Sequence, residues 1–275
     1  MPTRLPLIHA RLSTRLAASI GMLALGCALL GAASNAAAQS AAPSRLEQII
    51  SRGTLRVCTT GDYKPYSFQR PDGGFEGIDI DLSEALAKSL KVKVEYVKTS
   101  WPKLMDDFTS QCDIGVGGIS TSLERQKRAF FSMPYMIDGK SPIARCADAK
   151  RYTSVAAIDQ AGVKVIVNPG GTNEKFARQC LTHANLTVYP DNVTIFKQIL
   201  NGQADVMVTD TSETLLQQKL NPGLCSVHLD QPFQYGEKAY LLPRGDVVFQ
   251  QYVDQWLHLF QAGGEFQTVI DQWLK

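Results

Sequence analysis

The chain has 275 residues, of which 44% are hydrophobic and 20% charged, and its formal charge at pH 7 is +2. This composition is that of a globular protein and excludes a wholly disordered chain or a collagen-like repeat. The charges are too evenly balanced for the basic stripe of a nucleic-acid-binding protein, so we expect no nucleic-acid partner.

The first 38 residues have the pattern of a secretory signal peptide. Residues 1–15 carry three arginines and no acid, an apolar stretch follows over 16–33, and small residues surround Ala38. This order predicts export to the periplasm and cleavage after Ala38. Two alternatives stay open: an uncleaved membrane anchor, because the apolar stretch approaches the length of a span, and a lipoprotein signal modified at Cys27. No second long apolar stretch follows, so we expect no stable membrane insertion after cleavage.

Five cysteines follow this segment, and an odd number leaves at least one thiol free in an oxidising compartment. Cys146 and Cys225 flank the middle third of the chain and are the favoured disulfide pair. Cys58 and Cys112 lie in or beside strand-like segments and are interpreted as small buried residues. The spacing of cysteines and histidines matches no metal site, so we expect no metal.

Strands and helices alternate along the rest of the chain, which predicts mostly parallel sheets covered by helices on both faces. Asp79 or Asp81 can cap one of the helices, and Thr-Ser-Leu-Glu at 121–124 is a capping box that begins another. The apolar periodicity places helices at 45–52, 79–90, 101–108, 172–183, 191–201 and 210–219, and strands at 54–60, 92–98, 113–116, 163–167, 185–189 and 204–208.

Two extended segments, 136–146 and 234–242, stand apart from this alternation. They bracket a stretch that can form an α/β unit of its own, so the two segments would cross a hinge between two lobes. The predicted fold is α/β with two lobes that close a cleft around a small ligand. After a linker at 39–44, lobe 1 is expected to comprise 45–142 and 238–275, and lobe 2 to comprise 143–237.

Several motifs resemble a known family. The residues Gly118-Ile-Ser-Thr, Glu124-Arg125 and Phe131-Ser-Met-Pro-Tyr135 resemble the polar-amino-acid solute-binding proteins of the periplasm, and the likeness extends over about residues 45–275. Longer stretches are similar to one enzymatic branch of that family, the cyclohexadienyl dehydratases. These stretches are 60–66, 100–105, 168–177, 190–196 and 237–243.

The resemblance implies a type II periplasmic-binding-protein fold and an enzyme without a cofactor. Its substrates would be prephenate, converted to phenylpyruvate, and arogenate, converted to phenylalanine. Such a site must hold two carboxylates, exclude water and protonate a departing hydroxyl. The alternative is a non-catalytic protein that delivers an amino acid to the permease of an ABC transporter, because binding and catalysis share this scaffold.

Arg125 is expected to hold one substrate carboxylate, since a guanidinium grips a carboxylate with two charge-assisted hydrogen bonds. The alternative is a surface arginine paired with Glu124 or Asp138. The turn at Gly171 and the helix start that follows it are expected to hold the second anion through backbone N–H groups. Thr172 would add a hydroxyl to this site or cap the helix. Asn168 and Asn173 are expected to bond polar groups of the substrate, or to serve the turn alone.

Glu213 is the expected proton donor, because the resemblance implies a glutamate three residues after the aspartate that opens its helix, here Asp210. Such an acid needs a pKa raised by burial. Thr211 and Ser212 are more polar than the branch leads us to expect, which makes that burial less assured. The alternative for Asp210 and Glu213 is a capping box. In amino-acid-binding relatives the aspartate pairs with the ligand ammonium, so Asp210 would admit arogenate or only cap the helix.

Five further residues are expected around the substrate. Lys140 would place a charge near the substrate carboxylate or assist the departing hydroxyl; a solvated lysine is the alternative. Tyr63 and Trp101 would form an aromatic wall that excludes water. By the same resemblance, Ser120 and the carbonyl of Gly118 would complete the contacts.

Overall fold

Two β-sheets organise the part of the chain that the structure, a computed structural model, describes. The described residues are 43–275, and they form one compact unit. The predicted signal peptide and its alternatives lie outside the described residues. Every helix within 43–275 is too short or too polar to cross a bilayer.

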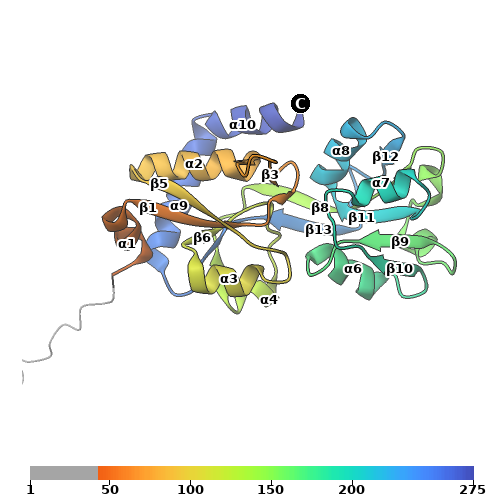
Figure 1. The fold of residues 1–275 in the computed structure, drawn as a ribbon, viewed down its shortest axis with the longest axis horizontal. Coiled ribbons are helices and arrows are strands. Elements are labelled where there is room, and N and C mark those ends of the chain that lie inside the picture. Colours follow the sequence, from red (N-terminus) through yellow and green to blue (C-terminus); the bar gives the residue numbers. More distant parts are fainter. Residues whose placement is uncertain (1–42) are drawn as a thin grey trace, which may run out of the picture. The chain divides into compact units, whose positions relative to one another are not determined.

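The first sheet has a parallel centre and an antiparallel edge. β1 (Thr54–Thr59) pairs in parallel with two neighbours, and the strand that returns from the C-terminal part of the chain pairs in antiparallel fashion with two others. Two helices, α2 (Ile78–Leu90) and α3 (Leu104–Gln111), lie on opposite faces of this sheet (Figure 1). The strand order is β5 (Lys93–Lys98), β1, β6 (Ile114–Gly115), β14 (Leu241–Pro243) and β7 (Ala129–Phe131).

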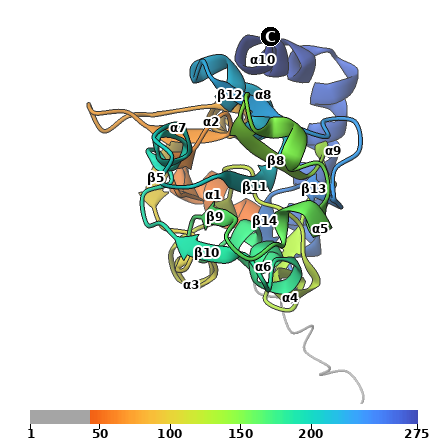
Figure 2. The same ribbon diagram turned by 90° about the vertical axis from the view of Figure 1, so that its right-hand side faces the viewer.

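The second sheet is built in the same way. β9 (Lys164–Val167) pairs in parallel with β10 and β11, and the long strand β8 (Met136–Arg145) pairs in antiparallel fashion with β11, β12 and β13. Helices α6 (Thr172–Cys180) and α7 (Ile195–Leu200) lie on either side of this sheet (Figure 2). The other strands are β10 (Asn185–Val188), β11 (Val206–Asp210), β12 (Leu224–Ser226) and β13 (Gln234–Lys238).

The remaining elements are shorter or lie outside the two sheets. A small third sheet contains β2 (Asp62–Tyr63), β3 (Ser67–Gln69) and β4 (Phe75–Glu76). The other helices are α1 (Arg45–Arg52), α4 (Leu123–Gln126), a 3-10 turn η1 (Ala149–Arg151), α5 (Val155–Ile158), α8 (Thr211–Leu220), α9 (Val247–Ala262) and α10 (Glu265–Leu274).

Each sheet has its own buried apolar core. Leu55, Leu82 and Phe249 belong to the core of the first sheet, whereas Val165 and Phe176 belong to that of the second. Burial of apolar area contributes about 25 cal/mol per Å² to stability. The alternating strands and helices predicted from the apolar periodicity are therefore held by apolar packing at each sheet, and the buried residues form four clusters among the described residues.

The prediction of mostly parallel sheets is wrong in one respect. The strands that alternate with helices are parallel, as expected, but β8, β12, β13, β14 and β7 add antiparallel pairs at the edges. Both sheets are therefore mixed. The physical reason is that β8 and β13 run in opposite directions between the two halves of the chain and pair with each other. β8 also pairs with β11 and β12, which run against it.

Several predicted boundaries differ from the structure because local hydrogen bonds decide them. The predicted helix at 101–108 begins only at Leu104, after a turn. The predicted helix at 191–201 begins at Ile195, because the Asp191 carboxylate accepts from the N–H groups of Val193 and Thr194 and forms a turn there.

The two predicted helix caps are also wrong. Helix α2 begins after Gly77 without a side-chain cap. Asp79 instead accepts from the N–H groups of Gly117 and Gly118, both at 2.7 Å, and holds the turn that carries them. Helix α4 is capped by Ser122, whose hydroxyl accepts from the backbone N–H of Arg125, so the predicted capping box of Thr121 and Glu124 does not form.

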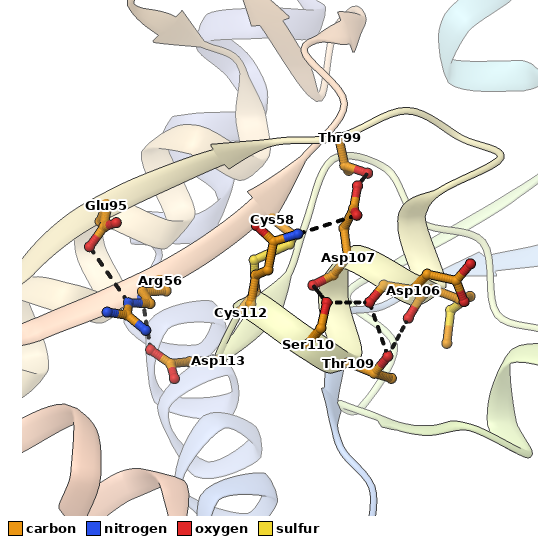
Figure 3. The surroundings of a disulfide bond; sticks show 12 residues. Arg56, Cys58, Glu95, Thr99, Asp106, Asp107, Thr109, Ser110, Cys112 and Asp113 are labelled. Atoms are coloured by element: carbon orange, nitrogen blue, oxygen red, sulfur yellow. Dashed lines mark hydrogen bonds and ion pairs between the residues drawn. A yellow bond between two sulfur atoms is a disulfide. The ribbon is translucent and has the colours of Figure 1, made fainter.

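Two disulfides join neighbouring elements. Cys146 and Cys225, the favoured pair, are bonded, and they tie the end of β8 to β12. Cys58 and Cys112, interpreted as small buried residues, are buried, but they are also bonded to each other, which the sequence analysis did not predict (Figure 3). Their Cα atoms lie 5.7 Å apart, which is within disulfide range, because β1 pairs with the strand that directly follows Cys112. Cys180 is a free thiol at the end of α6.

Candidate active site

Ten residues that come from both sheets and their loops line one pocket. The cavity that they leave has a volume of about 10 Å³, the space of a single water molecule. All ten substrate contacts that the sequence predicts are in this set. They are Tyr63, Trp101, Gly118, Ser120 and Arg125 on the side of the first sheet, and Asn168, Gly171, Thr172, Asn173 and Asp210 on the side of the second.

Arg125 presents a guanidinium group that none of the described carboxylates pairs with. Its Nη1 donates to the carbonyl oxygen of Ser120 at 2.8 Å, and the guanidinium lies 6.0 Å from the centre of the Trp101 ring. Glu124 pairs with a neighbouring lysine, and Asp138 accepts from hydroxyl groups, so the predicted surface pairing is wrong. Burial lowers the pKa of Arg125 to about 10, which leaves it charged at neutral pH. The group is free to bind an anion.

The turn before α6 brings backbone N–H groups against the aromatic side of the pocket. Gly170 has φ +79°, and a Cβ atom there would lie 2.6 Å from the ring of Pro102, so the turn requires glycine. Helix α6 begins after Gly171 without a side-chain cap. Thr172 therefore does not cap the helix; its hydroxyl accepts from Lys140 Nζ at 3.0 Å.

The two asparagines of the pocket are bonded to each other and to its wall. Asn173 Nδ2 donates to Asn168 Oδ1 at 3.3 Å and to Thr209 Oγ1 at 2.8 Å. Asn173 Oδ1 accepts from the ammonium group of Lys140. These bonds fix both amides at the helix start and link the pocket to β11.

Asp210 is the anionic centre of the site. The antiparallel pairing of β8 with β11 places Lys140 opposite Asp210, and Lys140 Nζ lies 2.6 Å from Oδ1. The other oxygen, Oδ2, is 2.5 Å from Lys238 Nζ and accepts from the Tyr63 hydroxyl. Burial alone would raise the pKa of Asp210, but the two ammonium groups outweigh burial and hold the pKa well below its usual range. Asp210 is therefore ionised.

Two alternatives for this cluster are wrong. Asp210 makes no side-chain capping bond to α8, although it precedes that helix. Lys140 is only 5% exposed rather than solvated. Burial lowers the pKa of Lys140, and the neighbouring Asp210 opposes that effect.

Lys238 is the residue of this cluster that the sequence analysis missed. It ends β13 and is fully buried. Its Nζ donates to the carbonyl oxygen of Gly118 at 3.0 Å and to Ser120 Oγ at 3.1 Å, and it lies 5.3 Å from the ring centres of Tyr63 and Tyr66. One feature of the sequence points to this residue. Lys238 directly precedes the apolar stretch that enters the first sheet, and a lysine that is buried with such a stretch needs a polar partner.

Glu213 lies in the first turn of α8 and is 1% exposed. Its Oε2 accepts from Thr209 Oγ1 at 2.5 Å, so it does not form the capping box offered as an alternative. Burial raises its pKa to about 8; the Thr209 hydrogen bond opposes this rise, and the charge of Asp210 adds to it. Glu213 is therefore protonated at neutral pH.

The polar residues between Asp210 and Glu213 do not hydrate this carboxyl. Thr211 Oγ1 donates to the carbonyl oxygen of Gly139 at 3.1 Å, and Ser212 Oγ donates to Asp138 at 2.6 Å. Both hydroxyls are bonded to strand β8. Their polarity is compatible with the burial of Glu213.

Glu213 does not line the ten-residue pocket. Thr209 stands between them: its hydroxyl bonds Glu213 on one side and accepts from Asn173, a residue of the pocket wall, on the other. Glu213 instead lines a second cavity of about 210 Å³, together with Asp62, Gln217 and others. The carboxyl thus lies between the pocket and this second cavity.

Within residues 43–275, no cluster of three or more His, Cys, Asp or Glu side chains is placed to hold a metal ion. The polar groups that converge on the site are an arginine, two lysines, amides, hydroxyls and two carboxyls. They can bind anions and move protons.

Comparison with known proteins finds a matching family and several similar proteins. The bacterial extracellular solute-binding proteins, family 3, match residues 55–275. A cyclohexadienyl dehydratase of Pseudomonas aeruginosa is 52% identical over 253 residues, which are 92% of this chain and 93% of that protein. The crystal structure of an ancestral cyclohexadienyl dehydratase is 51% identical, with a TM-score of 0.55, and the match covers 85% of this chain and 98% of the other.

A second ancestral structure is that of an amino-acid-binding protein described as a precursor of cyclohexadienyl dehydratase. It is 34% identical, with a TM-score of 0.79, over 84% of this chain and 100% of the other. The relatives therefore include both an enzyme and a binding protein.

Proposed function

This chain belongs to the bacterial extracellular solute-binding proteins of family 3, and we propose that it is an enzyme of this family, a cyclohexadienyl dehydratase. It has the two-lobed type II periplasmic-binding-protein fold and acts as a carbon–oxygen lyase on prephenate and L-arogenate. The observation that carries the proposal is Glu213, a buried carboxyl that keeps its proton up to a pH of about 8 beside an anion-binding pocket. A protein that only binds an amino acid has no use for such a proton donor.

The reaction defines what the site must supply. The bond between the ring and its carboxylate breaks, its electron pair enters the ring, and CO2 leaves. The bond between the ring and its hydroxyl breaks, and the oxygen leaves as water after it takes up one proton. The ring becomes aromatic, and each turnover of prephenate to phenylpyruvate consumes one proton.

The two substrate carboxylates are held from opposite sides of the pocket. Arg125, which has no carboxylate partner among the described residues, binds one of them with charge-assisted hydrogen bonds. The N–H groups at the start of α6 and the Thr172 hydroxyl bind the other, with the ammonium group of Lys140 adjacent. Tyr63 and Trp101, whose ring centres lie 5.5 Å apart edge to face, close the aromatic side against water.

Glu213 supplies the proton for the departing hydroxyl, and Thr209 bridges the acid to the pocket wall. The Thr209 hydroxyl donates to Glu213 Oε2 and accepts from the Nδ2 of the pocket residue Asn173, so it holds the acid against the pocket wall. To pass a proton on, this hydroxyl turns so that it accepts from the carboxyl and donates toward the substrate. A neutral carboxyl near its pKa is a suitable acid at neutral pH, because it combines the right protonation state with a driving force for transfer.

The substrate enters when the lobes separate. A cavity of about 10 Å³ cannot hold a ten-carbon acid, and the hydroxyl of Tyr63 now reaches across to Asp210. We assign lobe 1 to 45–142 and 238–275 and lobe 2 to 143–237, with β8 and β13 as the hinge. Residues 1–38 act as a signal peptide, and the mature protein works in the periplasm on a small-molecule substrate without a cofactor.

A turnover assay tests the proposal against the amino-acid-binding alternative. The protein without residues 1–38 is incubated with prephenate at neutral pH, and phenylpyruvate is followed against a protein-free control, since prephenate aromatises spontaneously in acid. Saturable turnover is the expected result. Folded protein that converts neither prephenate nor arogenate, but binds an amino acid in calorimetry, contradicts the proposal and favours delivery to a transporter permease.

Replacement of Arg125 tests the carboxylate site. Arg125→Met is expected to lower kcat/KM for prephenate by roughly 10- to 100-fold, because a hydrogen bond to a charged group contributes about 1.5–3 kcal/mol. The matched control is Arg128→Met, which removes an exposed arginine that pairs with Asp106 outside the pocket. Equal kcat/KM values for the two variants would show that Arg125 does not bind a substrate carboxylate.

A further inference from the structure

The second cavity beside Glu213 connects this buried carboxyl to the surface. The cavity has a volume of about 210 Å³. Glu213 lies at its buried end, whereas Val193 and Leu220, which also line it, are 51% and 54% exposed. The carboxyl is thus within reach of solvent from a direction that does not pass through the ten-residue pocket.

The wall of this cavity is suited to hold water. Asn192 is buried, and its Nδ2 donates to the carbonyl oxygen of Asp62 at 3.1 Å, whereas its Oδ1 has no partner among the described residues. Asn221 Nδ2 donates to Gln217 Oε1 at 2.8 Å, which leaves the Gln217 amide nitrogen free to donate. A polar cavity of this volume has room for several water molecules, and the unpartnered oxygen of Asn192 needs one.

The catalytic cycle needs such a connection. Glu213 loses its proton in each turnover and must regain one before the next. The pocket retains only about 10 Å³ when the lobes are together, and Glu213 does not line it. Return of the proton through the pocket would therefore wait for the lobes to separate. The second cavity offers a path that does not depend on that motion.

We propose that the 210 Å³ cavity is the proton entrance of the enzyme and that Gln217 positions the water that returns the proton to Glu213. This inference rests on the proposed dehydratase function. Gln217 is four residues after Glu213, so the two side chains lie on the same face of α8. In the step itself, hydronium or a buffer acid gives a proton to the water chain, which gives one to the Glu213 carboxylate; no other bond changes.

The charged groups around Glu213 divide between the two sides. Asp210, Lys140 and Lys238 lie on the pocket side, where they are paired with one another. Asp62 and Lys64 line the second cavity. Burial raises the pKa of Asp62, so this carboxyl takes up a proton more readily than an exposed aspartate and supports delivery from its side.

Gln217→Met is the test, because it keeps the length of the side chain and removes its hydrogen bonds. The matched control is Gln218→Met. Gln218 is the next residue of α8, does not line the cavity, and accepts from the N–H of Ser226 at 3.0 Å. Phenylpyruvate is measured with enzyme in excess, which reports the first turnover, and with prephenate in excess, which reports repeated turnover.

Gln217→Met is expected to keep the rate of the first turnover, since Glu213 begins protonated, and to slow repeated turnover by roughly 10-fold or more. KM is expected to fall by about the same factor, so that kcat/KM is unchanged, because the slowed step follows the chemistry. The progress curve then shows a burst of one phenylpyruvate per enzyme. Raising the concentration of imidazole buffer is expected to restore the steady rate, which distinguishes proton supply from slow product release. Asn221→Leu, which removes the other amide of the cavity wall, is expected to behave in the same way and replaces Gln217→Met if that variant does not fold.

Three results would overturn the inference while leaving the dehydratase function intact. They are a steady rate like that of Gln218→Met, an equal slowing of the first and later turnovers, and a burst that does not respond to buffer concentration. If the wild-type protein forms no phenylpyruvate in either regime, the proposed function itself fails, and the inference fails with it.

Discussion

Two carboxyl groups at the start of α8 differ sharply, although both are buried and lie three residues apart. Burial raises the pKa of each. Asp210 faces two ammonium groups within 2.6 Å, and its pKa falls well below the usual range. Glu213 faces a threonine hydroxyl and the negative charge of Asp210, and its pKa rises to about 8. Neighbouring charges, rather than burial, decide which carboxyl is ionised.

The backbone explains why the two groups have different neighbours. Asp210 ends β11, where strand pairing places Lys140 opposite it. Glu213 is one helical turn further on, where its side chain points back to Thr209 and to the second cavity. One short strand–helix junction therefore provides an ionised group that holds the cations of the site and a neutral group that can donate a proton.

The largest expected effect comes from removing the neutral carboxyl. Glu213→Gln is expected to lower kcat by about 10²- to 10⁴-fold, the usual contribution of a general acid, with little change in KM. In the wild-type protein, kcat/KM is expected to fall as the pH rises above about 8, because the carboxyl then loses its proton. Steady-state rates of phenylpyruvate formation at pH 6–10 measure both effects.

The same substitution should also change how stability depends on pH. A carboxyl whose pKa is raised by folding costs stability as the pH rises, by roughly 1.4 kcal/mol per unit. For Glu213 this range runs from 4.5, its ordinary pKa, to about 8. Glu213→Gln should therefore unfold at a higher urea concentration than the wild-type protein at pH 8.5, with a smaller difference at pH 5. The exposed control Glu47→Gln should show neither effect. A wild-type kcat in Glu213→Gln would show that Glu213 is not the proton donor.

Removing the ionised carboxyl is expected to affect folding rather than proton donation. Asp210→Asn leaves Lys140 and Lys238 without their carboxylate, and an unpaired buried charge typically costs about 3–5 kcal/mol. Asp210 has a lowered pKa, so its contribution to stability is present above 3.8, its ordinary pKa, and is lost as the pH falls below that value. Urea unfolding should show that Asp210→Asn has a much lower free energy of unfolding than the wild-type protein at pH 7. The difference should be smaller at pH 3.

The control for this comparison is Asp230→Asn, which changes an exposed aspartate. If Asp210→Asn is as stable as this control at pH 7, Asp210 does not stabilise the buried charges of Lys140 and Lys238. The contrast between the two carboxyls would then rest on Glu213 alone.

The motifs of the sequence located the pocket well because its residues occupy turns and helix starts. Gly171, Thr172 and Asn173 lie at the start of the helix that follows β9, and Asp210 ends β11, so the ends of two adjacent strands bring them together. The places of these residues in the sequence therefore predict that they lie together in the structure. Burial could not be inferred for Lys140, since a lysine in an extended segment is usually solvated; its partner became evident only from the pairing of β8 with β11.

The groups that escaped prediction act through contacts between distant parts of the chain. Lys238 reaches Gly118 and Ser120 because β13 returns beside the first sheet, and no local pattern records that approach. The bond between Cys58 and Cys112 depends in the same way on the packing of α3 beneath β1. The second cavity belongs to no motif, because residues of three separate segments form it. Periodicity and local motifs predict elements, whereas these features require their packing.

The smallest expected effect comes from Thr209, whose hydroxyl lies between Glu213 and the pocket wall. Thr209→Val keeps the shape of the buried side chain and removes the hydroxyl that bonds Glu213. Because that hydrogen bond lowers the pKa of Glu213, its loss should raise the pKa further and move the alkaline fall of kcat/KM to higher pH.

The same variant should lower kcat by roughly 10-fold, since the proton no longer has a bridge to the pocket wall. The control is Thr214→Val, which removes another buried hydroxyl of α8, bonded to the carbonyl oxygen of Thr211 rather than to a carboxyl. A pH profile of Thr209→Val that coincides with that of Thr214→Val would show that Glu213 delivers its proton without the hydroxyl. A reduced kcat together with the alkaline shift would show that the Thr209 hydroxyl bonds Glu213 in the working enzyme and supports its proton donation, because loss of packing alone lowers activity without moving the pH profile.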